Sequence, residues 1–201
     1  KDKANNKGGS TAAEGQDPAS QNPSSDHLER AVPSSQDGQF ESAAESIRQA
    51  LRDNPELAEL SKQVMVDQTP EGLRIQLVDQ DQRPMFEKGT ANPTPAAQRL
   101  LGAIAKIVDR LPNRVSISGH TDGGAFAGAN GTTNWELSAE RANAARAILT
   151  RQGLESDRIY EVVGKASSEP LLPEDPNASA NRRLSILLMR EAPPAPPGGR
   201  L

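Results

Sequence analysis

The sequence contains no cysteine, and aromatic residues make up only 2% of its 201 residues. The lack of cysteine excludes disulfides, thiolate metal sites, iron–sulfur clusters and cysteine nucleophiles. The shortage of aromatic residues leaves few platforms on which bases or sugar rings could stack. Because the formal net charge is −4, no strong positive field attracts nucleic acid, and we expect no nucleic-acid partner.

Long apolar runs are also missing, and no run approaches the roughly 18–20 residues that a membrane helix needs. The chain begins at Lys1 without a signal-like segment, so we interpret it as a matured or cut fragment. Residues 1–38 have the polar composition of a flexible linker. Residues 191–201 are rich in Pro and Gly and predict a disordered tail.

An amphipathic helical segment is predicted over residues 39–63. Phe40, Ile47 and Leu51 lie on one stripe at helical spacing. The stripe is too short to hold a helix alone in water, so we expect this helix to dock on the domain that follows. Two alternatives stay open: permanent packing of the helix, or its release in a second state.

The apolar residues concentrate in residues 64–190, where we place one domain. Alternating segments on both sides of residues 69–72 predict a hairpin, and Thr94-Pro95 predicts the start of a second helix. Ser138 is predicted to cap a third helix that stops at Gly153. Strands that alternate with helices predict an α/β class, an α+β mixed sheet with the helices on one face.

Enzymatic and metal-binding patterns are weak in this sequence. It has two histidines, His27 in the linker and His120 at a strand end, too few for the usual ligand spacing of zinc. No G-x-S-x-G elbow supports a serine nucleophile, and residues 119–124 match neither a P-loop nor a dinucleotide fingerprint. We therefore predict a protein that is not an enzyme and uses no metal and no cofactor.

A charged binding site is the stronger interpretation. The Asp122 carboxylate and the Arg141 guanidinium suit a zwitterion, with the ligand's ammonium on Asp122 and its carboxylate on Arg141. The alternative is that these two side chains pair with each other. Arg182 and Arg183 are neighbours in a strand, so one supports the site and the other is exposed. Trp135 is either a plug beneath the loop or a wall of the site.

The order of the polar motifs resembles that of OmpA-like peptidoglycan-binding domains. SGHTD at 118–122, N-x-x-L-S-x-x-R-A at 134–142 and N-R-R at 181–183 follow that pattern. Residues 64–190 are most similar to the MotB-like branch, the wall anchors of flagellar motor stators. The resemblance implies the βαβαββ two-layer order for this domain and non-catalytic binding of the diaminopimelate-containing stem peptide of the cell wall. The peptidoglycan-binding residues that it implies are Thr121, Asp122, Asn134, Leu137, Arg141 and Arg183, with Arg182 as the other match to the N-R-R element.

The resemblance also implies partners and a location. Members of this branch are single-pass inner-membrane proteins whose periplasmic part forms a homodimer and holds peptidoglycan. Their membrane helix, which this chain lacks, pairs with a MotA-like channel subunit. We therefore expect a periplasmic fragment of such a protein. Two alternatives stay open: another wall-tethering member, such as the Pal lipoprotein or an OmpA-type porin domain, and a periplasmic cell-wall enzyme.

Overall fold

The structure, a computed structural model, describes residues 35–128 and 131–191. Most of the predicted linker and nearly all of the predicted tail lie outside these residues. Residues 35–38 were assigned to the linker, but they form the first turn of a helix. Tertiary contacts extend the helix to this point, because Gln36 donates a hydrogen bond to the Glu191 carbonyl (2.9 Å) and Asp37 pairs with Arg190 (2.7 Å).

Helix α1 (Ser35–Asp53) is the predicted amphipathic helix. It buries Phe40, Ile47 and Leu51 and packs against α3 (Pro95–Val108) and the hairpin strands. A short helix, α2 (Pro55–Ala58), follows with Asn54 as its cap, and the 3-10 turn η1 comes next. The helix is thus docked in this structure, and its release in a second state stays a prediction.

Five strands form one mixed sheet in the order β1-β2-β5-β3-β4. Strands β1 (Val64–Thr69) and β2 (Gly72–Val78) form the predicted antiparallel hairpin. Strand β5 (Arg183–Met189) lies between β2 and β3 (Val115–His120) and runs antiparallel to both, while β4 (Ile159–Gly164) is parallel to β3. From β2 onward the element order is βαβαββ, as predicted, with β1 in front of it.

The prediction that Ser138 caps the third helix is wrong. Helix α4 (Asn134–Arg151) begins after Thr133, whose side chain accepts a hydrogen bond from the backbone of the first turn, while Glu136 bonds back to the cap. This capping box needs Glu or Gln three residues after the cap. Thr133 meets that condition through Glu136, whereas Ser138 is followed at that distance by Arg141.

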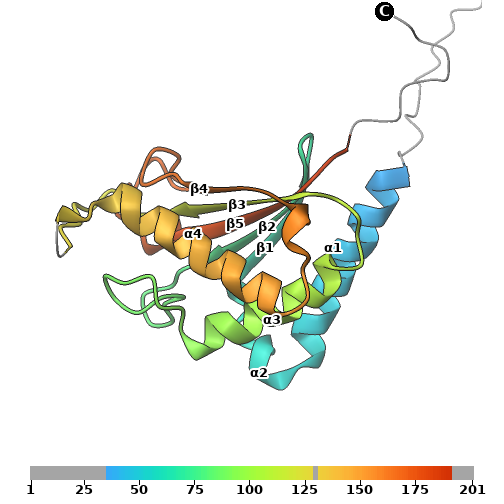
Figure 1. The fold of residues 1–201 in the computed structure, drawn as a ribbon. Coiled ribbons are helices and arrows are strands. Elements are labelled where there is room, and N and C mark those ends of the chain that lie inside the picture. Colours follow the sequence, from blue (N-terminus) through green and yellow to red (C-terminus); the bar gives the residue numbers. More distant parts are fainter. Residues whose placement is uncertain (1–34, 129–130, 192–201) are drawn as a thin grey trace, which may run out of the picture. The chain divides into compact units, whose positions relative to one another are not determined.

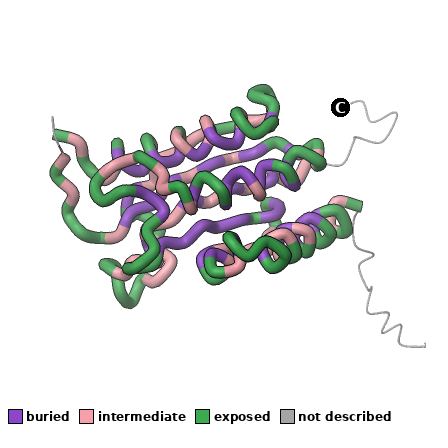
Figure 2. The backbone as a smooth tube through the Cα atoms, turned by 90° about the horizontal axis from the view of Figure 1, so that it is seen from below, coloured by how far each residue is buried: buried purple, intermediate pink, exposed green. Residues whose placement is uncertain are grey.

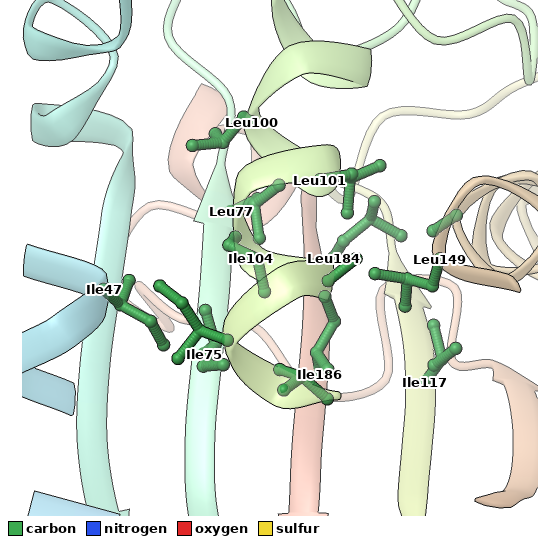
Figure 3. Close-up of a cluster of buried hydrophobic side chains, with 14 of the residues drawn as sticks. Ile47, Ile75, Leu77, Leu100, Leu101, Ile104, Ile117, Leu149, Leu184 and Ile186 are labelled. Carbon is green, nitrogen blue, oxygen red and sulfur yellow. The ribbon is translucent and has the colours of Figure 1, made fainter. Parts of the chain in front are cut away.

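Helices α1, α3 and α4 lie together on one side of the sheet (Figure 1). The buried residues line the facing sides of the helices and the strands (Figure 2). In Figure 3, Ile75 of β2 and Ile186 of β5 lie near Ile104 of α3, and Ile117 of β3 lies near Leu149 of α4. Burying one such side chain contributes about 1.5–3 kcal/mol, and the core forms between this inner face of the sheet and the helices that cover it.

No helix of the described residues is long and apolar enough to cross a membrane.

Candidate functional site

The ends of three neighbouring strands converge on the main pocket. Because β5 is antiparallel to its neighbours, its first residue Arg183 lies opposite Val78 at the end of β2 and His120 at the end of β3. The loops that follow these two strands therefore meet beside the residue that precedes β5. A pocket of about 460 Å³ opens there, and its lining includes Asp79, Thr121, Asp122, Asn134, Leu137, Arg141 and Arg182.

Arg182 connects two carboxylates of this pocket. Its Nη1 lies 2.8 Å from Asp122 Oδ2, and its Nε lies 3.0 Å from Asp79 Oδ2. Burial lowers the pKa of Arg182, but hydrogen bonds to Asp122 and Asp79 outweigh burial and raise that pKa above its ordinary value. Asp79 also accepts a hydrogen bond from the Met85 backbone (2.5 Å), which fixes the loop after β2. The two carboxylates are thus held in place before any ligand arrives.

Arg141 supplies a positive charge to the same pocket that Asp79 and Asp122 line. It projects from α4, is 8% exposed, and its guanidinium lies 5.1 Å from the centre of the Phe86 ring. Its Nε donates to the Thr90 carbonyl (2.9 Å), while its two Nη groups donate to no described residue. Burial lowers the pKa of Arg141, and the carboxylates of Asp79 and Asp122 act against this effect.

Asp122 and Arg141 line one pocket without pairing with each other. Asp122 accepts hydrogen bonds from Arg182 and from the Gly124 backbone (3.0 Å), and Arg141 is held by Thr90 and Phe86. Among the described residues, no hydrogen bond or ion pair joins the two side chains. This placement contradicts the alternative in which they neutralise each other.

Close packing of α4 on β3 positions Arg141. A Cβ at Gly119 would lie 2.1 Å from the Ser138 carbonyl oxygen, so only glycine permits this approach. The Ser138 hydroxyl accepts from the Ala166 backbone (3.0 Å), and the Ala166 carbonyl accepts from the Thr121 backbone (2.8 Å). Ser138 therefore ties α4 to the segment that carries Thr121, a structural role that its assignment as a cap did not predict.

The other predicted residues take smaller parts in the pocket. The Thr121 hydroxyl donates to the Asp122 carbonyl (3.0 Å), and Asn134 Nδ2 donates to the Gly124 carbonyl (2.8 Å). Leu137 is buried beside them and offers an apolar contact. These residues shape the loop around Asp122 and leave the charged groups facing the pocket.

Arg183, which the sequence analysis predicted as a binding residue, does not line the main pocket. Arg182 lines it instead. Arg183 donates from Nε to Gln76 Oε1 (3.0 Å) and from Nη2 to the Glu169 carbonyl (2.8 Å). The reason is the alternation of a strand, since neighbouring residues point to opposite faces. Sequence reasoning described this alternation and chose Arg183 as a site residue, whereas Arg182 is the member of the pair that lines this pocket.

Trp135 is neither a plug nor a wall of the pocket. Its side chain is 56% exposed, and it is absent from the pocket lining. Asp79 and Phe86 are among the pocket residues that the sequence analysis missed, and Asp79 is the one that holds Arg182. The available signal for Asp79 was its position directly after an apolar strand, and the loop position of Asp122 at the end of β3 is a similar signal.

His120 is buried, with 4% exposed, and lies next to the pocket rather than in its lining. Its Nε2 is 3.2 Å from the Ser118 hydroxyl, and its Nδ1 has no partner among the described residues. Burial, and then the positive charge of Arg183, lower the pKa of His120 to about 4, so the ring is neutral at pH 7. Within residues 35–128 and 131–191, no group of three or more potential metal ligands is present.

Comparisons with known proteins place this geometry in a family. The OmpA family matches residues 85–183. Motility protein B of Escherichia coli K12 is 42% identical over 146 residues, which are 72% of this chain and 47% of that protein, so the chain spans about half of its length. The flagellar export/assembly protein LafU of the same organism, named as truncated, is 34% identical over 74% of this chain and 68% of its own length.

A solved structure supports the fold. The crystal structure of the periplasmic domain of Helicobacter pylori MotB aligns with a TM-score of 0.56 and 22% identity, over 64% of this chain and 89% of that chain. The mixed sheet with helices on one face is therefore an architecture shared with a MotB periplasmic domain. Together, the motifs, the fold and the relatives show that this chain belongs to the OmpA family.

Proposed function

We propose that this domain binds the diaminopimelate-containing stem peptide of peptidoglycan without cleaving it and thereby anchors a flagellar stator to the cell wall. The main support is the separation of charge in the pocket, where Asp122 and Arg141 line one cavity and neither neutralises the other. Relatedness to Motility protein B supports the motor assignment.

The ligand's carboxylate would bind the two Nη groups of Arg141. These groups form a planar fork that matches a carboxylate with two parallel hydrogen bonds. The Phe86 ring and the Thr90 carbonyl hold the guanidinium from the other sides, so little side-chain freedom is lost on binding.

The ligand's ammonium would bind Asp122. Each carboxylate oxygen accepts more than one hydrogen bond, so the contacts to Arg182 and Gly124 leave acceptor capacity for a third donor. Arg182 acts as a positioning residue because it holds the Asp122 carboxylate at a fixed place. A diaminopimelate headgroup offers both charges at one end, whereas a lysine side chain offers only the ammonium.

The pocket lining favours binding over catalysis. The Thr121 hydroxyl is committed to the Asp122 carbonyl, and the neutral His120 ring lies outside the lining. No described hydroxyl of the pocket therefore has a base beside it, which nucleophilic catalysis requires.

The whole protein would be a single-pass inner-membrane protein with this domain in the periplasm. Its membrane helix would pair with a MotA-like channel subunit, and its periplasmic part would form a homodimer. The similarity to Motility protein B, of which this chain spans about half, supports these partners.

Co-sedimentation with purified sacculi tests the proposal. Removing one partner of a desolvated charge pair costs about 2–5 kcal/mol, so Asp122→Asn and Arg141→Ala should each weaken wall binding by at least about thirtyfold. The control is Arg151→Ala, which removes an exposed arginine from the end of α4. Walls that contain diaminopimelate should bind better than walls that contain lysine. Unchanged binding in both site variants, or equal binding to the two walls, would refute the assignment.

A further inference from the structure

The outer face of the sheet, opposite the helices, carries a second hollow of about 380 Å³. No described helix lies over this face (Figure 1). Strand alternation points the polar residues of β2, β3 and β5 into it. Its lining includes Arg74, Ser118, Arg183 and Ser185, and none of these four lines the main pocket.

Arg183 brings a half-buried positive charge to this hollow without a carboxylate partner. Its described acceptors are all neutral: the Gln76 side chain and the carbonyls of Asn181 and Glu169. Burial lowers the pKa of Arg183, the Glu169 carboxylate opposes this, and the charge of Arg74 lowers the pKa further. A guanidinium taken partly out of water is costly unless an anion compensates it.

Arg74 supplies a second cation on the neighbouring strand. It is exposed, and it forms no hydrogen bond or ion pair with any described residue. Between the two arginines lies a row of polar side chains, because Gln76 and Ser118 both lie opposite Ser185 in the register of the sheet. The Ser185 hydroxyl can donate to an oxyanion between the arginines, and the Ser118 hydroxyl, which lies 3.2 Å from His120 Nε2, is beside it on the next strand.

The carboxylates at the rim of the hollow already have partners. Glu169 pairs with Lys165 (2.9 Å), and Glu161 accepts a hydrogen bond from Ser116 (2.8 Å). The Thr69 side chain bonds Glu71 and lowers its pKa, and the charge of Arg74 adds a smaller lowering.

We propose that this outer-face hollow is a second binding site, specific for an oxyanion such as a carboxylate or a phosphate group. Arg74 and Arg183 would bind the anion, and Ser118 and Ser185 would orient it on the sheet. The site is separate from the main pocket, because Arg182 faces that pocket and Arg183 faces this hollow.

Titration of the whole ¹⁵N-labelled chain tests the site. Sodium phosphate and sodium acetate are the two probes, added at constant ionic strength against sodium chloride. We expect saturable shifts of the Ser118 and Ser185 amides. Arg74→Gln, which removes the charge of an exposed side chain that has no described hydrogen bond or ion pair, should weaken this binding about tenfold. Arg151→Gln is the matched control and should bind as the wild type does.

The two probes distinguish the sources of the anion. Saturation by acetate assigns the hollow to carboxylates, saturation by phosphate assigns it to phosphates, and saturation by both assigns it to their shared oxyanion chemistry. Asp122→Asn should leave these shifts intact, which separates this site from the peptide pocket. Shifts that stay linear with both probes, or equal affinity in wild type and Arg74→Gln, would overturn the proposal.

Discussion

Strand β5 turns Ile186 toward the helices and Leu187 toward the outer face, so one strand serves two different environments. The inner side is apolar along its length and is closed by α1, α3 and α4 (Figure 3). The outer side mixes serines and charged residues and remains open to water. Burial of apolar area drives folding, whereas uncovered polar groups keep their hydrogen-bonding capacity for a ligand. The comparison indicates that stability resides on the inner face and that binding resides at the strand ends and on the outer face.

The largest expected loss of stability comes from a substitution on the inner face of the sheet. Ile186→Ala deletes a side chain with no exposed area and should lower the free energy of unfolding by about 2–5 kcal/mol. Leu187→Ala, one residue along and on the other face, should cost less than about 1 kcal/mol. Urea denaturation of both variants measures the difference. Equal losses would show that the two faces do not differ as described.

His120 predicts a pH dependence of stability. Its pKa is about 4 in the folded protein against 6.5 for an ordinary histidine, so the unfolded chain binds the extra proton between these values. Stability should therefore be complete above pH 6.5 and fall as the pH drops toward 4. The contribution is at most about 3 kcal/mol, and water and salt reduce it.

His120→Gln isolates this contribution from that of the carboxylates. Urea denaturation between pH 7 and pH 4 should give a flatter profile for the variant than for the wild type. Parallel profiles would mean that His120 is not protonated differently in the folded and unfolded states.

A smaller loss of stability is expected for Ser138, which lies where α4 packs against β3 beside the pocket. Ser138→Ala leaves the buried Ala166 backbone donor without its acceptor and should cost about 1–3 kcal/mol. Ser46→Ala removes an exposed hydroxyl bond to the Ser42 carbonyl and should change stability by less than about 0.5 kcal/mol. Thermal unfolding of the two variants compares them. A neutral Ser138→Ala would contradict the tie between α4 and the segment at Thr121.

Substitutions of Arg182 and Arg183 distinguish the main pocket from the outer-face hollow. Arg182→Gln should weaken sacculus binding about tenfold, because Asp122 loses the ion pair that holds it. Arg183→Gln should change it by less than about twofold, since that side chain lies on the other face. Sedimentation with sacculi measures both. The reverse order would restore Arg183 to the peptide site.

The sequence predicted the order of the elements because local signals determine them. Alternation identified the hairpin, and Thr94-Pro95 identified the start of α3. The start of α4 was misplaced because Ser138 resembles a cap when read alone, although the Glu that completes a capping box follows Thr133. A pair of signals at fixed spacing was needed there.

The candidate site was predictable in its motifs and less so in its contacts. Asp122 and Arg141 were found from charge, loop position and resemblance, and both line the pocket. Asp79 was missed because it joins the site through strand pairing between residues distant in sequence. The choice between Arg182, which precedes β5, and Arg183, its first residue, depended on which side of the sheet each side chain takes, and that side follows from the pairing of β5 with β2.

The most direct test of the peptide pocket is a titration of ¹⁵N-labelled protein with a free stem tripeptide that ends in diaminopimelate. The account predicts saturable shifts at the amides of Thr121, Asp122 and Leu137, abolished by Arg141→Ala, with Arg151→Ala unaffected. Shifts confined to residues of the outer face, or pocket shifts that persist in Arg141→Ala, would contradict it.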